Sequence, residues 1–596
     1  MGRQLDNPGT MAAPAQAQFS PNTSEPERLG ARRALMLGLN IASWLALAAL
    51  MARIIGGAGW SWAGAIVLAL FLIGLPWTLL AFWSSVIGFI ILRCFNDPAS
   101  YTNPSLRATP AGSPLTARTA ICLAIRHESV PRVAARLSAM RASLHAALEE
   151  TAGDDGLFAF HILSDSTHPE ICAEEAAEFT TVPGLHYRRR AANTGYKAGN
   201  LRDFACEHRG RTDFMLVLDA DSLMSGPAML RLVRIMQANP DLGILQTLVA
   251  GRPANTPFAR IFQFGMRHGM RTHTTGIAWW QGSSGPYWGH NAIIRVAPFV
   301  DHCALPVLSG RSPLSGHVLS HDQVEAALMR AAGMEVRVIA DEFGSWEENP
   351  PTLPDFIRRD LRWCQGNMQY LRLIFRLRLR PMGRFQLGNA IAMYLGAPSL
   401  VLMLGAGIAN GLSRHDGPLP GAQLPGQLAF GLYFGMLGLG FAPRLLGVLD
   451  IMLRPAQRRR WGGGGRLLAG AATDALFTLL IGPVMMIAQA RFLAGLLFGR
   501  RVIWEAQQRD GQALPLREAV RGLWPQLVFG LGFSMALARV APAAIPWALP
   551  TIAGCLLAIP FACMTAEPRL GRWMVRIGLC AVPDEYDPGP ELQNSA

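Results

Sequence analysis

The stretch DFMLVLDADSLM (residues 213–224) ends an apolar run in two aspartates one residue apart, Asp219 and Asp221. The run is typical of a buried strand, and in an open parallel sheet ligands bind beyond the carboxyl ends of the strands. Since side chains alternate along a strand, both carboxylates should point the same way. Such a pair can hold a hard divalent cation, Mg²⁺ or Mn²⁺, that neutralises a diphosphate. The alternative is an ordinary turn, or a cap of the helix expected near Pro227.

Other polar residues follow neighbouring apolar stretches. Glu128 comes after AICLAI, and Asp165 comes after FAFHILS. The small-residue loop NTGYKAGN contains Lys197, whose ammonium group can meet phosphate as a point charge, and Gly199, which permits close backbone approach. The loop therefore adds a phosphate-binding group to the predicted metal site.

Three later stretches carry further candidates. Asp322, in LSHDQVEAALMRAAG, begins an amphipathic pattern, so it could cap a helix or act as a base. Arg362 and Trp363 are adjacent in RRDLRWCQGNMQY, which could also form a helix lying on a membrane surface. YWGHNAIIR carries His290 and Asn291, and a lone histidine is more often structural than functional. Spacing alone leaves these alternatives open.

The composition predicts a membrane protein with a large water-exposed part. Of 596 residues, 51% are hydrophobic and only 16% are charged. The net charge of +13 could indicate nucleic acid, but the sequence has no zinc-ligand spacing and no RNP-like motif. Arginines in short loops between apolar segments follow the positive-inside rule instead. We therefore expect the lipid bilayer, and not nucleic acid, as a partner.

Five regions follow one another along the chain. Residues 1–30 are polar and are expected to be a disordered tail, and residues 31–95 contain two apolar segments long enough to span a bilayer. In residues 96–385, short apolar strands (AICLAI, FAFHILS, FMLVLDA and VRVIA) alternate with helical patterns, which predicts an α/β domain with a mostly parallel sheet. Residues 386–568 hold five more apolar segments, and residues 569–596 form a C-terminal tail. Flanking arginines predict that the α/β domain and both termini are cytoplasmic.

One apolar segment, 468–498, conflicts with this charge pattern if it crosses the membrane once. Gly482 and Pro483 interrupt it near its middle, and a re-entrant or tightly paired hairpin would resolve the conflict, although about 31 residues are short for two full crossings. We expect seven or eight crossings in total. Asp474 and Arg491 lie in this segment, and intramembrane charges usually mark a pathway.

The motifs, in this order, resemble the processive family 2 glycosyltransferases of the cellulose synthase and hyaluronan synthase type. The pattern of that group is an isolated Asp, Asp-x-Asp, Thr-Glu-Asp and Gln-x-x-Arg-Trp, placed between membrane helices. Here Ser320, His321 and Asp322 replace Thr-Glu-Asp, and Arg359 replaces the glutamine. These departures, with YWGHNAIIR, LSHDQVEAALMRAAG and VPDEYDPG, resemble a narrower family, the glucans biosynthesis glucosyltransferase H family, over nearly the whole chain from about residue 30.

The resemblance implies a fold, a reaction and a set of site residues. The fold would be a GT-A-like, Rossmann-type α/β domain inserted between transmembrane helices. The reaction would transfer glucose from UDP-glucose, with inversion, to the linear β-1,2-glucan backbone of osmoregulated periplasmic glucans at the bacterial inner membrane. The implied roles are Asp322 as catalytic base; Glu128, Asp165, Lys197, Asp219 and Arg362 as donor-binding residues; Trp363, His290 and Asn291 as acceptor-binding residues; and Asp219 and Asp221 as metal ligands.

Other functions remain open at this stage. The product could be a cellulose-like β-1,4-glucan or hyaluronan, or the chain could be a transporter with a nucleotide-sugar-sensing domain, or a sensor without catalysis. The lack of an internal repeat and of a P-loop argues against the transporter, and the retained acids argue against the sensor. The resemblance also implies acyl carrier protein and a periplasmic glucan-modifying protein as partners. A glucan is too polar to cross lipid unaided, so we expect the membrane helices to form a channel for it.

Overall fold

The computed structural model describes residues 28–57, 59–107, 112–151, 153–413, 426–502 and 513–595. The predicted disordered tail, residues 1–30, lies almost wholly outside them. The arginine-bearing stretch that follows the apolar segment 468–498, GRRVIWEAQQRD, also lies partly outside the described residues.

The α/β domain is built on a seven-stranded sheet in the order β3-β2-β1-β4-β8-β6-β9. All pairs are parallel except those that β8 makes with β4 and β6. The four strands expected from the sequence are all present, and the expected mostly parallel sheet is confirmed. The strands are β1 (Thr119–Ile125), β2 (Phe158–Ser164), β3 (Leu185–Arg189), β4 (Phe214–Asp219), β6 (Leu242–Thr247), β8 (Ala292–Arg295) and β9 (Glu335–Ile339).

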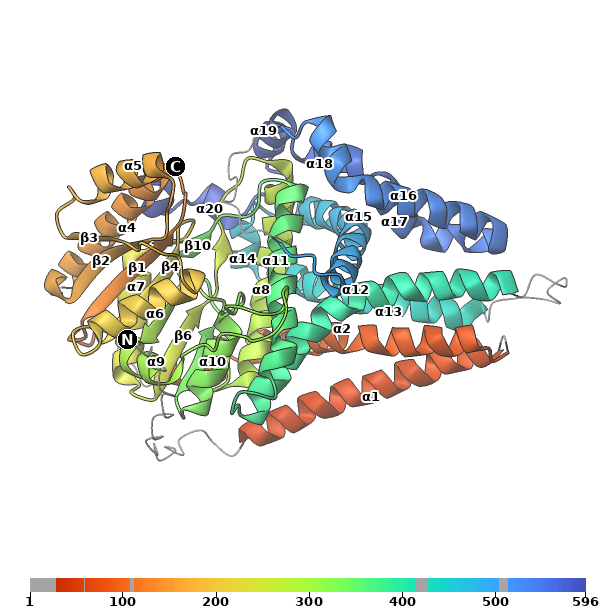
Figure 1. The fold of residues 1–596 in the computed structure, drawn as a ribbon, viewed down its shortest axis with the longest axis horizontal. Helices are drawn as coiled ribbons and strands as arrows, with labels where there is room; N and C mark the ends of the chain where they lie inside the picture. The colour runs from red at the N-terminus through yellow and green to blue at the C-terminus, as the bar shows by residue number, and fades with distance from the viewer. Residues whose placement is uncertain are drawn as a thin grey trace, which may run out of the picture.

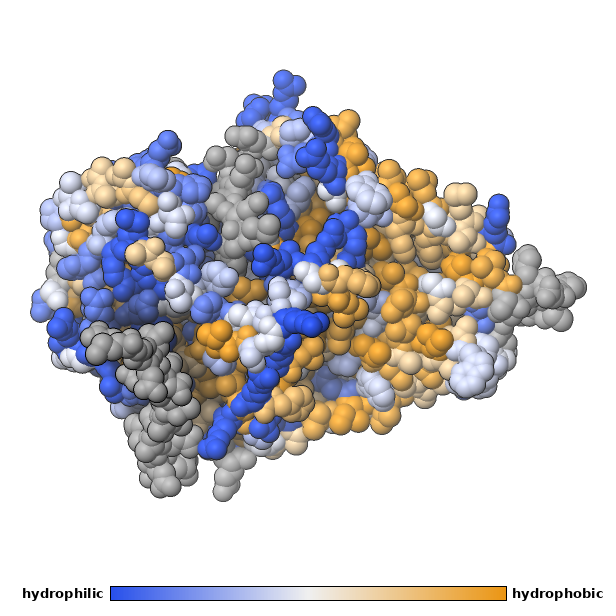
Figure 2. Space-filling model, viewed as in Figure 1, coloured by the Kyte–Doolittle hydropathy of each residue, from blue (hydrophilic) through white to orange (hydrophobic). Residues whose placement is uncertain are grey.

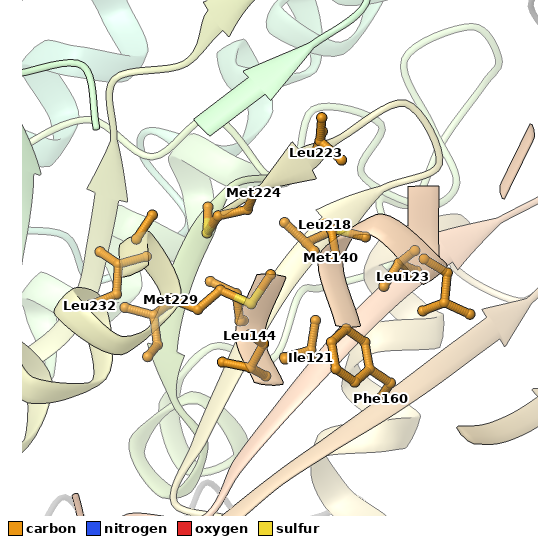
Figure 3. Close-up of a cluster of buried hydrophobic side chains, with 14 of the residues drawn as sticks. Ile121, Leu123, Met140, Leu144, Phe160, Leu218, Leu223, Met224, Met229 and Leu232 are labelled. Carbon is orange, nitrogen blue, oxygen red and sulfur yellow. The ribbon is translucent and has the colours of Figure 1, made fainter. Parts of the chain in front are cut away.

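Helices cover both faces of this sheet, which explains why its central strands are apolar along their whole length. On one face, Ile121, Leu123 and Leu218 pack against Met140 and Leu144 (Figure 3). The helices on this face are α4 (Val130–Glu150) and α7 (Gly226–Ala238), and those on the other are α6 (Tyr196–His208), α9 (Val296–His302) and α10 (Asp322–Ala331). A small sheet, β5-β10-β7, is formed by β5 (Leu223–Met224), β7 (Ala250–Gly251) and β10 (Ser345–Glu347).

Long apolar helices form the other half of the molecule (Figure 1). In the described part of the chain, six helices are long and apolar enough to cross a membrane, or seven if one bent pair is a single span. Figure 2 shows apolar surface gathered over this half and hydrophilic surface over the sheet. The six are α1 (Arg28–Gly57), α2 (Trp62–Cys94), α12 (Pro381–Ser413), α13 (Gly426–Met452), α15 (Gly464–Leu497) and α16 (Leu516–Val540); the bent pair includes α17 (Ile545–Leu556) and α18 (Ala558–Thr565).

The structure has no hairpin within residues 468–498. Helix α15 continues through Pro483 for 34 residues, or about 51 Å at 1.5 Å per residue. That length exceeds one hydrocarbon core of about 30 Å but is too short for two crossings. The sharp bend, 58°, instead separates α17 from α18.

Helix α8 (Pro257–Gln281) joins the two halves of the molecule, because it belongs to the α/β domain yet packs against α2, α13 and α15. Asp474 of α15 is buried there, with its Oδ2 3.0 Å from Arg444 Nε and 3.4 Å from His268 Nε2. Arg491 is exposed on the same helix. Neither residue lines the cavities described below.

Candidate active site

A cavity of about 270 Å³ opens at the carboxyl ends of β1, β2 and β4. Parallel strands expose their following loops at this edge, which is where an open α/β sheet binds its ligands. All of the predicted site residues except Asn291 line it. They are Glu128, Asp165, Lys197, Asp219, Asp221, His290, Asp322, Arg362 and Trp363.

Asp219 is the last residue of β4 and is paired with Lys197. The ammonium group of Lys197 donates to Asp219 Oδ1 and, at 2.7 Å, to the carbonyl oxygen of Gly289. Gly289 has a φ of +84°, and a Cβ there would lie 3.4 Å from Cβ of Asp322. Lys197 therefore connects the start of α6, the end of β4 and the loop that passes Asp322.

Asp165 is buried and is bound by an arginine that belongs to none of the sequence motifs. Its two carboxylate oxygens accept from Nε and Nη2 of Arg190, at 2.8 and 2.9 Å. Arg190 also pairs with Asp203 and donates to the carbonyl oxygen of Tyr196. Burial lowers the pKa of Arg190, but the hydrogen bonds that Arg190 donates to Asp165 and Asp203, together with the charges of those carboxylates, raise that pKa overall. Arg190 thus ties Asp165 to the loop that presents Lys197.

Asp322 is the first residue of α10, and His321 occupies the N-cap position without a side-chain cap bond. Capping therefore does not account for Asp322, whose half-buried side chain faces the cavity. His321 Nδ1 lies 2.9 Å from Oε2 of the buried Glu325. Burial lowers the pKa of His321, whereas the charge and hydrogen bond of Glu325 raise it, and the net result is a raised pKa. A histidine with a raised pKa therefore precedes Asp322 in the chain.

Glu347, on β10, lines the same cavity but carries no motif that the sequence could reveal. Its Oε2 lies 3.4 Å from Nε2 of His290. Burial raises the pKa of Glu347; His290 and Arg359 oppose this, and the charges of Asp221 and Asp219 add to it. Pairing of strands distant in sequence brings this carboxyl to the paired aspartates.

The acceptor-binding prediction for Asn291 needs correction. Asn291 is fully buried outside the cavity lining, with a φ of +50°. Its Nδ2 donates to Ser345 Oγ at 2.8 Å and to the carbonyl oxygen of Trp346 at 3.2 Å. Asn291 therefore supports β10, and only its neighbour His290 reaches the cavity.

Helix α11 (Leu353–Leu373) brings two cations and an aromatic ring to the cavity. The guanidinium of Arg359 lies 4.9 Å from the ring centroid of Trp363, one helical turn away, and Trp363 is 49% exposed. Arg362 lies on the same wall. Cys364 and Met368 of α11 are buried in an apolar cluster with residues of α12 and α15, so this face of the helix packs on the long apolar helices. Arg359, noted in the sequence only as a departure, thus adds a second cation to the site.

The donor atoms of Asp219 and Asp221 fit a hard divalent cation in type. Among the residues that the structure describes, no three His, Cys, Asp or Glu side chains gather as a metal site. Mg²⁺ characteristically takes one or two carboxylates and completes its shell with water and substrate phosphates. Two carboxylates beside a cavity are therefore a sufficient protein contribution.

Comparison with known proteins identifies relatives over most of the chain. The family described as "Glycosyl transferase family group 2" matches residues 214–442. A "Glucans biosynthesis glucosyltransferase H" from Rhodopseudomonas palustris is 38% identical over 544 residues, covering 88% of this chain and 73% of that protein. One of the same name from Xanthomonas campestris pv. campestris is 35% identical over 599 residues, covering 96% and 90%.

Among solved structures, a mannosyltransferase from Pyrobaculum calidifontis, in complex with GDP-Man and Mn²⁺, aligns with a TM-score of 0.41 and 15% identity. The alignment covers 65% of this chain and 97% of that one.

Proposed function

Because this chain belongs to the glucans biosynthesis glucosyltransferase H family, we propose that it polymerises glucose from UDP-glucose into a linear β-1,2-glucan. It is a glycosyltransferase of glucan biosynthesis with several long apolar helices. We also propose that the product is exported across the bacterial inner membrane, and that the catalytic domain and both termini lie in the cytoplasm. One observation carries it: the paired aspartates, Asp322 and the cations of α11 line a single cavity.

The donor half of the site matches a nucleoside diphosphate sugar in charge. Asp219 and Asp221 would hold a divalent cation, which when bound supplies the charge that neutralises the diphosphate. Arg362 and Arg359 line the same cavity, where they can stabilise the negative charge that develops on the departing UDP. Glu128 and Asp165 follow β1 and β2, the side of the cavity that we assign to the nucleoside.

The acceptor half requires a base and a surface for a sugar. We assign Asp322 to take the proton from the acceptor hydroxyl as its oxygen bonds to the anomeric carbon. The bond between that carbon and the UDP oxygen breaks in the same step, so the configuration inverts and UDP leaves with the electron pair. Trp363 presents a half-exposed ring, and a flat apolar surface of this kind suits a sugar face.

A second cavity of about 150 Å³ supports export of the product. It shares Trp288 with the catalytic cavity and lies between α2, α8 and α12. Its lining combines aromatic rings, such as Trp77 and Trp280, with the amides of Gln281 and Gln386. Rings and amides together suit a polyhydroxylated chain, and an apolar channel would not.

The purified protein in detergent, supplied with UDP-glucose and Mg²⁺, tests the proposal through UDP release and linkage analysis of the product. β-1,2-Glucan is the expected result. A β-1,4 product would overturn the proposed linkage, and nucleotide-sugar binding without UDP release would favour the transporter or sensor alternative.

A further inference from the structure

The C-terminal segment returns from the membrane helices to the catalytic domain. After α18 the chain passes through α19 (Pro568–Ile577), α20 (Pro583–Tyr586) and α21 (Pro590–Asn594). Helix α20 runs toward the sheet half of the molecule, and the chain ends beside that half (Figure 1). Leu592 of α21 joins the core cluster of α4 and α7, and Ser595 accepts from Arg252 at 2.9 Å. The segment is thus part of the catalytic domain's packing.

The motif VPDEYDPG places two acids of this segment on two buried arginines of α8. Asp584 accepts from Nη1 of Arg267 at 2.6 Å and from Nη2 at 3.1 Å. Glu585 accepts from Nη1 of Arg260 at 2.6 Å. Removing one partner of such a buried pair leaves an uncompensated charge, so both contacts hold the segment in place.

Asp584 makes one contact that Glu585 lacks. Its Oδ2 also accepts from Nε1 of Trp346, at 2.8 Å, in the middle of β10. Arg267, the second partner of Asp584, also donates from Nε to Oε1 of Glu342 at 3.0 Å. Asp584 therefore fixes β10 to α8 from behind the catalytic cavity.

The position of β10 determines where Glu347 lies in the catalytic cavity. Trp346 is followed by Glu347, which lines the cavity and contacts His290. Trp346 also pairs with Leu223 of β5, two residues after Asp221, in the small antiparallel ladder. A shift of β10 would therefore move Glu347 and disturb its contact with His290.

We propose that Asp584 is a positioning residue of the active site: by holding Trp346, the C-terminal segment sets the place of Glu347 and His290 against the donor acids. The inference rests on the proposed function, because it concerns the same site. We assign the nucleoside to the loops after β1 and β2, whereas Asp584 binds Trp346 of β10, so loss of Asp584 lowers turnover more than it weakens UDP binding.

Three single variants of the full-length protein test this role. Asp584→Asn removes the charge, Trp346→Phe removes only the indole N–H, and Glu585→Gln is the matched control on the same segment. Each is measured for kcat and KM with UDP-glucose, for UDP affinity with Mn²⁺ by calorimetry, and for melting temperature in detergent. A double variant, Asp584→Asn with Trp346→Phe, measures the coupling of the two residues.

We expect kcat to fall at least about 10-fold for Asp584→Asn and for Trp346→Phe, with UDP affinity nearly retained. The double variant should be no slower than the slower single one. Glu585→Gln should keep the parental kcat while melting earlier. If Trp346→Phe turns over like the parent, or if Asp584→Asn does no more harm to kcat than Glu585→Gln, the positioning role is wrong. A parent that releases no UDP from UDP-glucose contradicts the proposed function instead.

Discussion

Lys197 pairs with Asp219: its ammonium group donates to the carboxylate that ends β4 and to the carbonyl oxygen of Gly289. A divalent cation held by the paired aspartates would therefore share this carboxylate with Lys197. Lys197 also places a positive charge where a diphosphate would arrive.

Replacing Lys197 with alanine should change two affinities in opposite directions. Mn²⁺ alone should bind more tightly, because a competing charge has gone from Asp219. UDP in the presence of Mn²⁺ should bind about 10-fold more weakly, since a charge-assisted hydrogen bond contributes about 1.5–3 kcal/mol. Titration calorimetry with each ligand measures both. Weaker binding of Mn²⁺ by the variant would contradict the shared-carboxylate interpretation.

Turnover should depend on a divalent cation held by the paired aspartates. Removal of metal with EDTA should stop UDP release, and Mg²⁺ or Mn²⁺ should restore it. Asp219→Asn and Asp221→Asn should both require more metal for half-maximal rate, because each loses a hard anionic ligand. Full activity of the parent in excess EDTA would show that turnover does not require a divalent cation held by the paired aspartates.

The His321–Glu325 pair predicts a pH dependence of stability. The pKa of His321 is raised above its ordinary value of 6.5 in the folded protein. Its stabilising contribution is therefore fully present below pH 6.5 and is lost as the pH rises through the raised value. His321→Asn should lower the melting temperature more at pH 6 than at pH 9. An equal loss at both values would mean that His321 is neutral in the fold.

The second cavity predicts a position at which a larger side chain blocks passage of the glucan but does not stop glucosyl transfer. Ala81 of α2 lines this cavity, whereas Ala69 of the same helix is exposed. In sealed vesicles, Ala81→Trp should shorten or abolish glucan delivered to the far side while UDP release from the first transfers continues. Ala69→Trp is the matched control and should behave as the parent. Normal delivery by Ala81→Trp would exclude this route.

The sequence predicted the residues that stand at strand ends and in helix starts, because local pattern determines where a strand ends. Asp165, Asp219 and Asp322 lie in the cavity for that reason. Glu347 and Arg190 could not be found in this way. Glu347 reaches the site only because β10 pairs with β5 and β7, and Arg190 acts through a carboxylate 25 residues earlier in the chain.

Two errors have physical causes of a similar kind. Asn291 follows His290 directly, but its positive φ turns its side chain to β10 and away from the cavity. Pro483 suggested a break, yet a proline within a membrane helix is tolerated where neighbouring groups compensate for the lost hydrogen bond, and α15 continues through it. Both outcomes depend on tertiary neighbours that a linear pattern does not contain.

The assignment of Asp322 as the base is the centre of the account, and Asp322→Asn tests it most directly. The variant should bind UDP with Mn²⁺ as the parent does, since we assign Asp322 to the acceptor and not to the donor, while UDP release and glucan formation fall by about a hundredfold or more. Calorimetry with UDP and a coupled assay of UDP release measure the two quantities on one preparation. An Asp322→Asn protein that binds UDP normally and retains near-parental turnover would contradict the account.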